Sequence, residues 1–476
     1  MSEWTDEQKA DHIFRLMKTL PTQQVIKIID RISPYLEQDI ISHLPYEIGL
    51  QILGYLDLSS LLQATRVCKN WKLLCEEQSV WRSLFINRGW GYDQDEMDAY
   101  LSNTMTTTSS PPKTKVASVS LNRTFRLKSI RLYKPTPHKQ AKELSHHYNW
   151  KSSSNCINWK RLYQNRLKIE RRWANGIQEI SEFPPLSTSL SELHKTEGIY
   201  CVQFDKNKYV TGSRDNTIKV WDMEGKCIQT IEGHTASVLC LQYNDKVIVS
   251  GSSDSTLMVS DLASGNHLRS LTGHSDSVLC LKLVGNDRVV SCSKDRSIKL
   301  WNMNTGECIR TYQGHEAAVN AVQWMDNYIV SASGDRTIRI WNLETGECIK
   351  KLVGHSRGVA CVDYDGSKIY SGSSDNTIKI WDAKTGECDY TLVGHTHLVR
   401  TIQLDKTANR LVSGCYNGMI KMWDLNERKL ICDVSSLVHG RVLNLKFDFS
   451  KIVCCTNSLR VVVFNFAFDV NTKFLL

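Results

Sequence analysis

Apolar residues recur at helical spacing near the start of the chain. Ile13, Leu16, Met17 and Leu20 lie three or four positions apart, which predicts amphipathic helices within 5–40. Residues 44–90 form a compact series of short apolar segments and predict a small helical domain. A basic amphipathic stretch at 157–174 predicts one further helix. We therefore expect a multidomain protein whose N-terminal region is all-α in these three segments.

From about residue 196 the pattern changes to a repeat of roughly 40 residues. Its units end in KVWD (219–222), MVSD (258–261), KLWN (299–302), RIWN (339–342), KIWD (379–382), KMWD (421–424) and VVFN (462–465). Gly-His pairs precede the middle units. A period near 40 with Gly-His and Trp-Asp is typical of WD repeats, each of which forms one four-stranded propeller blade. We predict an all-β, seven-bladed propeller over 189–476.

Each repeat also predicts a buried polar relay. In the fourth unit His315, Ser331, Asp335 and Trp341 can satisfy one another's hydrogen bonds inside the blade, so these histidines are interpreted as structural. The second unit departs from the pattern with Ser260 in place of Trp. The last unit departs at three positions: Cys454, Ser458 and Phe464.

A propeller ring must close, because an open ring exposes a sheet edge. The outer strand of the last blade is expected from 189–194, the alternative being the tail after Phe466. Residues 92–150 have no sustained period and are rich in Ser, Thr, Lys and Pro, which predicts a disordered insertion.

The net charge of +9 comes from one segment. Residues 1–100 carry 10 basic and 15 acidic side chains, residues 101–175 carry 16 and 2, and the remainder 33 and 33. No apolar run is long enough to span a bilayer, and the acidic N-terminus does not resemble a signal peptide, so we expect a cytoplasmic or nuclear protein. The cysteines show no CxxC spacing and are interpreted as small buried apolar residues in a reducing compartment; no metal or cofactor is predicted.

Three columns of the aligned repeats vary more than a scaffold requires. The first column, just after the Val or Ile that opens the innermost strand, contains Tyr200, Leu239, Leu279, Asn320, Ala360, Arg400 and Leu443. The second, two positions earlier, contains Gly198, Ser237, Ser277, Ala318, Gly358, Leu398 and Arg441. The third, before the turn Asp position, contains Arg214, Ser253, Lys294, Gly334, Ser374, Tyr416 and Asn457. These positions should face one surface, where arginines, together with Arg336 and Arg357, suit phosphate groups.

The segment 44–90 resembles an F-box. Leu44-Pro45 opens it, apolar residues follow on one helical face, and VCKNW (67–71) and the Trp81 region close it. The resemblance implies docking on the Skp-type adaptor of a cullin–RING ubiquitin ligase. The adaptor-binding residues it implies are Leu44, Pro45, Ile52, Leu53, Leu56, Leu61, Val67, Cys68, Trp71 and Trp81.

F-box and propeller together resemble the beta-TrCP family of F-box/WD-repeat receptors, over about 44–90 and 196–465. SASGDRTI (331–338), GSSDNTIKIWD (372–382) and GHSRGVAC (354–361) carry the likeness. It implies a non-catalytic subunit that recognises doubly phosphorylated Asp-Ser-Gly-x-x-Ser degrons, and a dimerisation region near 5–40. The matching degron-binding residues are Tyr200, Arg214, Ser237, Ser253, Asn320, Arg336, Arg357, Gly358, Ser374, Leu398, Arg400, Tyr416 and Arg441.

Two other classes of function stay open from the sequence. The basic segment 101–175 and its helix could bind nucleic acid, or the propeller could be a scaffold for unphosphorylated partners. An enzyme is the third class, although no nucleophile–base pair, metal set or glycine-rich phosphate loop stands out from the repeats.

Overall fold

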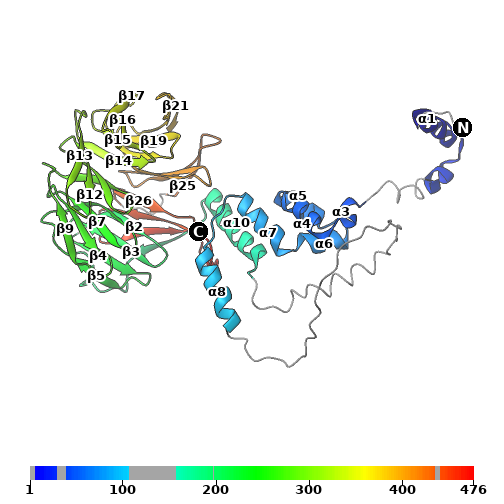
Figure 1. The fold of residues 1–476 in the computed structure, drawn as a ribbon, viewed down its shortest axis with the longest axis horizontal. Helices are drawn as coiled ribbons and strands as arrows, with labels where there is room; N and C mark the ends of the chain where they lie inside the picture. The colour runs from blue at the N-terminus through cyan, green and yellow to red at the C-terminus, as the bar shows by residue number, and fades with distance from the viewer. Residues whose placement is uncertain (1–5, 29–38, 107–156, 197, 435–439) are drawn as a thin grey trace, which may run out of the picture. The chain divides into compact units, whose positions relative to one another are not determined.

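The computed structural model describes residues 6–28, 39–106, 157–196, 198–434 and 440–476 (Figure 1). Two compact units are distinguished: residues 1–164 with 474–476, and residues 165–473. None of the described helices is long and apolar enough to cross a membrane.

The first unit is helical. Its elements are α1 (Asp6–Thr19), α3 (Ile40–His43), α4 (Tyr46–Gly54), α5 (Leu58–Ala64), α6 (Lys69–Cys75), α7 (Gln78–Asn87), α8 (Gln94–Thr106) and the start of α10 (Trp159–Asn175). Side-chain caps begin several helices, as where Asp57 accepts from the Ser60 N–H at 3.1 Å. Residues 22–28 are also helical, whereas 29–38 of the expected dimerisation region lie outside the described residues.

An aromatic cluster forms the core of this unit. Trp81 contacts Tyr163 with ring centroids 5.5 Å apart, and Phe85 contacts Trp90 and Trp159 at 5.4 and 5.8 Å. All three contacts are edge-on, a geometry that aromatic pairs prefer. The cluster fixes the end of the F-box-like helices against the start of α10.

Part of the expected disordered insertion is ordered, and that prediction is wrong for 94–106. Helix α8 begins where Asp93 accepts a hydrogen bond from the Glu96 N–H at 3.0 Å. Met97 is buried, and Tyr100 contacts Phe474 at 5.4 Å between ring centroids. Burial against a distant residue stabilises a helix whose own periodicity is weak. Residues 107–156 lie outside the described residues.

The second unit is a seven-bladed propeller of four-stranded antiparallel sheets (Figure 1). Blade 1 contains β2 (Ile199–Phe204), β3 (Lys208–Ser213), β4 (Ile218–Asp222) and β5 (Cys227–Ile231). Blade 2 contains β6 (Val238–Tyr243), β7 (Val247–Ser252), β8 (Leu257–Asp261) and β9 (His267–Leu271). Blade 3 contains β10 (Val278–Val284), β11 (Arg288–Ser293), β12 (Ile298–Asn302) and β13 (Cys308–Tyr312).

The remaining blades repeat this order of strands. Blade 4 contains β14 (Val319–Met325), β15 (Tyr328–Ser333), β16 (Thr337–Asn342) and β17 (Cys348–Val353). Blade 5 contains β18 (Val359–Tyr364), β19 (Lys368–Ser373), β20 (Thr377–Asp382) and β21 (Cys388–Val393). Blade 6 contains β22 (Val399–Asp405), β23 (Arg410–Cys415), β24 (Ile420–Asp424) and β25 (Lys429–Asp433). Blade 7 contains β26 (Asn444–Phe447), β27 (Lys451–Cys455), β28 (Val461–Asn465) and β1 (Glu179–Phe183).

Strand β1 closes the ring, and neither predicted closing segment is right. It pairs antiparallel with β28, with Glu179 opposite Asn465 and Phe183 opposite Val461. Residues 189–194 instead form the loop that leads into blade 1, where His194 takes the relay position although no Gly-His pair marks it. The pairing of β1 with β28 supplies the fourth strand of blade 7 and joins the two ends of the propeller sequence in one sheet.

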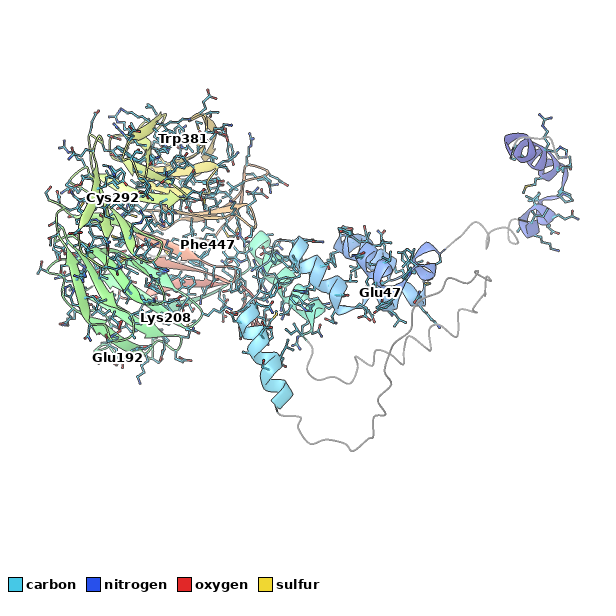
Figure 2. The ribbon with its side chains drawn as sticks, viewed as in Figure 1. Glu47, Glu192, Lys208, Cys292, Trp381 and Phe447 are labelled. Carbon is cyan, nitrogen blue, oxygen red and sulfur yellow. The ribbon has the colours of Figure 1, made fainter. Side chains whose placement is uncertain are left out.

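The predicted relay is present. In blade 4 the ring nitrogens of His315 lie 2.7 Å from Asp335 and 2.8 Å from Ser331, whose hydroxyl accepts from the Trp341 indole N–H at 2.8 Å. Trp381, labelled in Figure 2, makes the same bond to Ser371 in blade 5 at 2.8 Å. Burial lowers the pKa of His315, while Asp335 opposes that shift. A buried histidine with both nitrogens engaged is structural.

Three blades modify the relay. In blade 2 Met258 lies within contact of the loop glycine at 233, where other blades place the tryptophan ring, so it occupies space left by Ser260. Blade 7 replaces the polar set with the buried residues Cys454 and Phe464. Blade 6 keeps His395 and Trp423 but has Asn417 where blades 1 to 5 have Asp, a departure that the alignment of the repeats overlooked.

The cysteine interpretation is correct only in part. Cys201, Cys240 and Cys361 are buried in innermost strands, but Cys308, Cys348 and Cys388 begin outer strands and are exposed. An outermost strand has one face toward solvent, so the repeat position determines their exposure.

Candidate functional site

The turn geometry brings the three columns together on one face of the propeller. In six blades the third-column N–H donates to the second-column carbonyl of the same blade. The pairs are Arg214–Gly198 at 3.0 Å, Ser253–Ser237, Lys294–Ser277, Gly334–Ala318 and Ser374–Gly358 at 2.9 Å, and Tyr416–Leu398 at 3.1 Å. Because each of these blades repeats this bond at the entry to its innermost strand, the columns form one continuous face. We call it the substrate face.

The predicted arginines lie on this face in different environments. Arg214, Arg336, Arg357 and Arg441 are exposed, and Arg400 is half-buried. Burial raises the pKa of the Cys361 thiol to about 12, and the charge of Arg400 opposes that shift. Arg400 lies within the innermost strand of blade 6, β22, whereas the other four predicted arginines lie in turns and loops.

Two of the arginines are positioned by distinct contacts. The Arg441 guanidinium lies 5.7 Å from the ring centroid of Tyr416, a cation–π distance that joins blades 6 and 7. Arg336 follows the turn Asp with φ of 71°, a conformation that asparagine adopts at positions 216 and 376. An arginine in the left-handed region is uncommon and costs about 1 kcal/mol, but blades 1 to 5 all have a positive φ at this turn position, so the conformation belongs to the blade turn.

Neutral members of the predicted set line the gaps between arginines. Asn320 donates from Nδ2 to the Val359 carbonyl at 2.8 Å, and the Ser237 hydroxyl donates to the Arg214 carbonyl at 3.3 Å. A Cβ on Gly358 would come within 3.1 Å of the Gly334 Cα, so two glycines allow the adjacent blades to approach. The remaining predicted residues, Tyr200, Ser253, Ser374 and Leu398, lie at the same column positions.

Blade 3 adds two cations that the predicted site omitted. The Lys294 ammonium lies 3.5 Å from Asp276 and its side chain is 62% exposed. Arg296 is exposed with φ of 72°, the same turn position as Arg336 in the next blade. Extending the aligned columns by two residues would have found Arg296. The positive charge of the face therefore extends over blade 3.

The helical unit exposes a separate apolar surface. Ile48, Ile52, Tyr55, Leu62, Val67 and Leu73 are exposed, with Tyr55 86% accessible. We call these six residues the docking surface. Of the predicted adaptor-binding residues, Pro45, Ile52 and Val67 are exposed and Leu44, Leu56, Cys68 and Trp71 are half-buried. Scattered exposed apolar residues need no explanation, but a dense group on a small domain is typical of an interaction site.

Three predicted adaptor contacts are wrong. Leu53 and Leu61 are fully buried, and Trp81 is 3% exposed and donates its indole N–H to the Cys75 carbonyl at 2.9 Å. These side chains hold the helices together and are not available to a partner. Helical spacing identifies one apolar stripe, but it does not separate the half that faces the core from the half that faces solvent.

Two arginines of α10 within the propeller unit are committed to protein contacts. Arg166 is 3% exposed and pairs with Glu170 at 3.0 Å, and Glu170 in turn pairs with Arg410 at 3.0 Å. Arg172 donates to the Phe466 carbonyl at 3.0 Å and pairs with Asp469 at 2.7 Å. A buried guanidinium in an ion-pair network cannot also contact phosphates. These two arginines therefore give no support to the nucleic-acid alternative, whereas Lys168 and Arg171 of the same helix are exposed.

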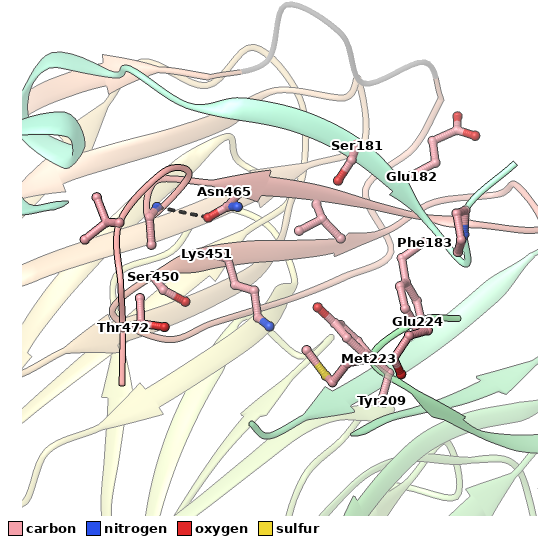
Figure 3. Close-up of a pocket in the computed structure, with 14 residues that line it drawn as sticks. Ser181, Glu182, Phe183, Tyr209, Met223, Glu224, Ser450, Lys451, Asn465 and Thr472 are labelled. Atoms are coloured by element: carbon pink, nitrogen blue, oxygen red, sulfur yellow. Dashed lines mark hydrogen bonds between the residues drawn. The ribbon is translucent and has the colours of Figure 1, made fainter. Parts of the chain in front are cut away.

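A cavity of about 450 Å³ lies where blade 7 meets blade 1 (Figure 3). Phe183, Tyr209, Glu224 and Lys451 are among its lining residues. The Lys451 ammonium lies 5.0 Å from the Tyr209 ring centroid. No residue of the three columns lines this cavity, so it is separate from the substrate face.

Known protein families match both the helical segment and the repeats of the chain. An F-box-like family model matches residues 41–87, and a family described as WD domain, G-beta repeat matches 187–222, 225–261, 265–302, 306–342, 346–382 and 386–424. The repeat matches end at residue 424, so the family model does not cover blade 7, whose four strands the structure shows.

Several relatives share this organisation. A probable E3 ubiquitin ligase complex SCF subunit sconB of Arthroderma otae is 31% identical, with 60% of this chain and 44% of that protein covered. An F-box protein of Saccharomyces cerevisiae is 29% identical, covering 64% and 49%. F-box/WD repeat-containing protein 7 of Drosophila melanogaster is 31% identical, covering 49% and 14%. The chain thus spans about half the length of the first curated relatives it matches.

Among solved structures, the computationally designed Ika8 protein matches with a TM-score of 0.50 and 31% identity. The match covers 56% of this chain and 83% of that one. With an F-box-like segment, six matched WD repeats and a seventh blade that completes the ring, the chain belongs to the F-box/WD-repeat proteins.

Proposed function

We propose that the protein is the substrate-recognition subunit of an SCF-type cullin–RING ubiquitin ligase. Relatives named as probable SCF subunits match across 60% and 67% of this chain. The docking surface would contact the Skp-type adaptor, and the substrate face would bind phosphorylated degrons. In this role the protein positions substrates for ubiquitination and proteasomal degradation and carries out no catalysis itself.

The observation that carries the degron proposal is the set of arginines on a face built from repeats. Five different blades, with the loops that lead into them, contribute one arginine each to this face: Arg214, Arg336, Arg357, Arg400 and Arg441. A guanidinium presents a planar fork of donors that matches phosphate oxygens, and a phosphoserine carries about −1.5 to −2 charges. Tyr416 and Leu398 add apolar contact between the charges. The face suits an extended peptide with two phosphates.

Peptide binding tests this proposal. A doubly phosphorylated Asp-Ser-Gly-x-x-Ser peptide should bind the full chain, and Arg400→Ala should weaken binding at least tenfold because a charged hydrogen bond contributes about 1.5–3 kcal/mol. Arg269→Ala, an exposed arginine on the outer strand β9, is the matched control and should bind normally. Fluorescence anisotropy gives both affinities. Equal binding of the unphosphorylated peptide would exclude the degron proposal and favour the scaffold alternative.

Binding of the Skp-type adaptor tests the second part of the proposal. Tyr55→Ala removes a side chain that is 86% exposed, so the protein should fold normally yet retain less Skp-type adaptor in a pull-down. Glu47→Ala, a neighbouring exposed position on α4, should retain it. If a Tyr55→Ala/Leu73→Ala double variant retains the adaptor fully, the docking surface is not where the adaptor binds.

A further inference from the structure

One position of the substrate face carries a histidine that the candidate site omits. The position directly before the second column contains Ala236, Asp276, Ala317, Arg357 and His397 in blades 2 to 6. Arg357 is a member of the candidate site, and His397 is its equivalent in blade 6. Both side chains are exposed. The repeat therefore places an imidazole in blade 6 where blade 5 has a guanidinium.

Backbone hydrogen bonds fix this position in the same way from blade to blade. In blades 2 to 5 its carbonyl accepts from a serine hydroxyl: Ala236 from Ser252 at 2.9 Å, Asp276 from Ser293 at 2.8 Å, Ala317 from Ser333 at 3.0 Å and Arg357 from Ser373 at 3.1 Å. Blade 6 has Cys415 in place of that serine, but keeps the adjacent bond from the Tyr416 N–H to the Leu398 carbonyl at 3.1 Å. His397 thus belongs to the substrate face.

The missing relay aspartate of blade 6 changes the contacts of this histidine. In blades 2 to 5 the residue after the relay histidine donates its N–H to the turn aspartate, as Ser356 does to Asp375 at 3.0 Å. Asn417 replaces the aspartate in blade 6 and donates from Nδ2 to the Thr396 hydroxyl at 2.8 Å. That hydroxyl lies 3.1 Å from Nδ1 of His397. A turn residue that completes the relay elsewhere therefore orients a surface histidine here.

The hydrogen bonds of Thr396 determine which imidazole nitrogen is available. Its hydroxyl oxygen already accepts from Asn417, and its own hydrogen can go to His397 Nδ1 at 3.1 Å or to the Met419 sulfur at 3.7 Å. The nitrogen is nearer and is the stronger acceptor, because a thioether sulfur accepts only weakly. A neutral imidazole that accepts at Nδ1 carries its proton at Nε2. Among the described residues Nε2 has no hydrogen-bond partner, so its N–H is available to a ligand.

The turn at 415–417 connects this histidine with an arginine of blade 7. The side chain of Thr396, next to His397, contacts the turn from blade 6. From blade 7, the N–H of residue 442 donates to the first carbonyl of the turn at 3.4 Å, and the Arg441 guanidinium lies 5.7 Å from the Tyr416 ring centroid. His397 and Arg441 therefore lie beside the same turn, one on each of two neighbouring blades.

We propose that His397 is a further phosphate-binding residue of the substrate face, whose Nε2–H donates to a phosphate of the degron at the junction of blades 6 and 7. This inference rests on the proposed function and deepens it. An imidazole N–H donates one hydrogen bond to a phosphate oxygen, and a protonated imidazole adds a charge-assisted bond. Thr396 is a positioning residue, because it acts through its bond to Nδ1.

Binding of four forms of the Asp-Ser-Gly-x-x-Ser peptide to the full chain tests the proposal: doubly phosphorylated, each singly phosphorylated, and unphosphorylated. Fluorescence anisotropy gives the affinities. His397→Ala should weaken binding of the doubly phosphorylated peptide about three- to tenfold, the effect of one lost hydrogen bond. His397→Arg should restore binding, because blade 5 has Arg357 at the equivalent position. Thr396→Val keeps the shape of the side chain but removes the hydroxyl, so it should weaken binding by a smaller factor.

His267→Ala is the matched control, because His267 is an exposed histidine on the outer strand β9 and should not affect binding. Of the two singly phosphorylated peptides, only one should lose affinity in His397→Ala, since one imidazole contacts one phosphate. Equal losses for both, no loss for the doubly phosphorylated peptide, or a His397→Arg variant as weak as His397→Ala would overturn this inference and leave the proposed function intact. If the natural chain binds no phosphorylated peptide, the proposed function fails and this inference fails with it.

Discussion

Blade 6 offers a direct test of the relay, because it lacks one member. In blades 2 to 5 the histidine Nδ1 lies 2.7–2.9 Å from a turn aspartate, for example His315 and Asp335 at 2.7 Å. His395 keeps its bond to Ser413 at 2.7 Å, but its buried Nδ1 has no hydrogen-bond partner among the residues that the structure describes. Asn417 instead donates to the Thr396 hydroxyl at 2.8 Å. Asn417→Asp should therefore complete the relay and stabilise the propeller.

The magnitude follows from the complete blades. Burial opposes ionisation of Asp335, but hydrogen bonds from Thr337 and His315 hold its pKa at about 2, below the ordinary 3.8. At about 1.36 kcal/mol per pH unit, this corresponds to about 2 kcal/mol at neutral pH. Met419 takes the place of Thr337 in blade 6, so one hydrogen bond is missing there. We expect Asn417→Asp to raise the free energy of unfolding by about 1–2 kcal/mol.

The pH dependence sharpens the test. Burial, and secondly the charge of Lys421, lowers the pKa of His395 to about 4 in the folded protein. In the unfolded chain the pKa of histidine is about 6.5, so between pH 6.5 and pH 4 the unfolded state binds more protons than the folded state. The folded protein therefore loses stability as the pH falls through this range. A carboxylate beside Nδ1 raises that pKa and reduces the loss. The advantage of the variant should thus grow from pH 7.5 to pH 5, and decline below pH 4 as the new carboxyl is protonated.

Urea unfolding followed by tryptophan fluorescence measures the difference at each pH. Asp335→Asn in blade 4 is the reciprocal control and should destabilise by about 2 kcal/mol. The reasoning is refuted if Asn417→Asp is no more stable than the natural protein, or if its advantage stays constant between pH 7.5 and pH 5.

Three further predictions concern Met258, Arg172 and the closing strand β1. Met258→Ala should lower the free energy of unfolding by about 2–4 kcal/mol in thermal unfolding, because Met258 fills the space of a missing tryptophan. Lys299→Ala, the control at the equivalent position of blade 3, should lower it by less than about 1 kcal/mol. Arg172→Ala should lower the unfolding temperature of the propeller in calorimetry, because the Phe466 carbonyl and Asp469 lose a donor; an unchanged temperature would contradict this. Deleting 179–183 should cause aggregation detectable by light scattering, because β28 loses its partner strand, whereas deleting 186–190 should not.

Much of the fold is predictable from the sequence because each blade is encoded locally. The repeat of about 40 residues predicted seven blades, and the spacing of His315, Ser331, Asp335 and Trp341 predicted their hydrogen bonds. Aligning the repeats also placed the columns of the candidate site on one face, since a repeated backbone bond holds each pair of positions together.

The tertiary structure decided what depends on distant partners. Strand β1 closes the ring through pairing with β28, and α8 is ordered where Tyr100 meets Phe474; neither partner is near in sequence. The apolar stripe of the F-box-like helices identified docking candidates, but only packing buried Leu53 and left Tyr55 exposed. The sequence alone determined the periodic units and their internal bonds. Which surfaces remain free depends on contacts between units, because burial is a property of the assembled neighbours and not of spacing along the chain.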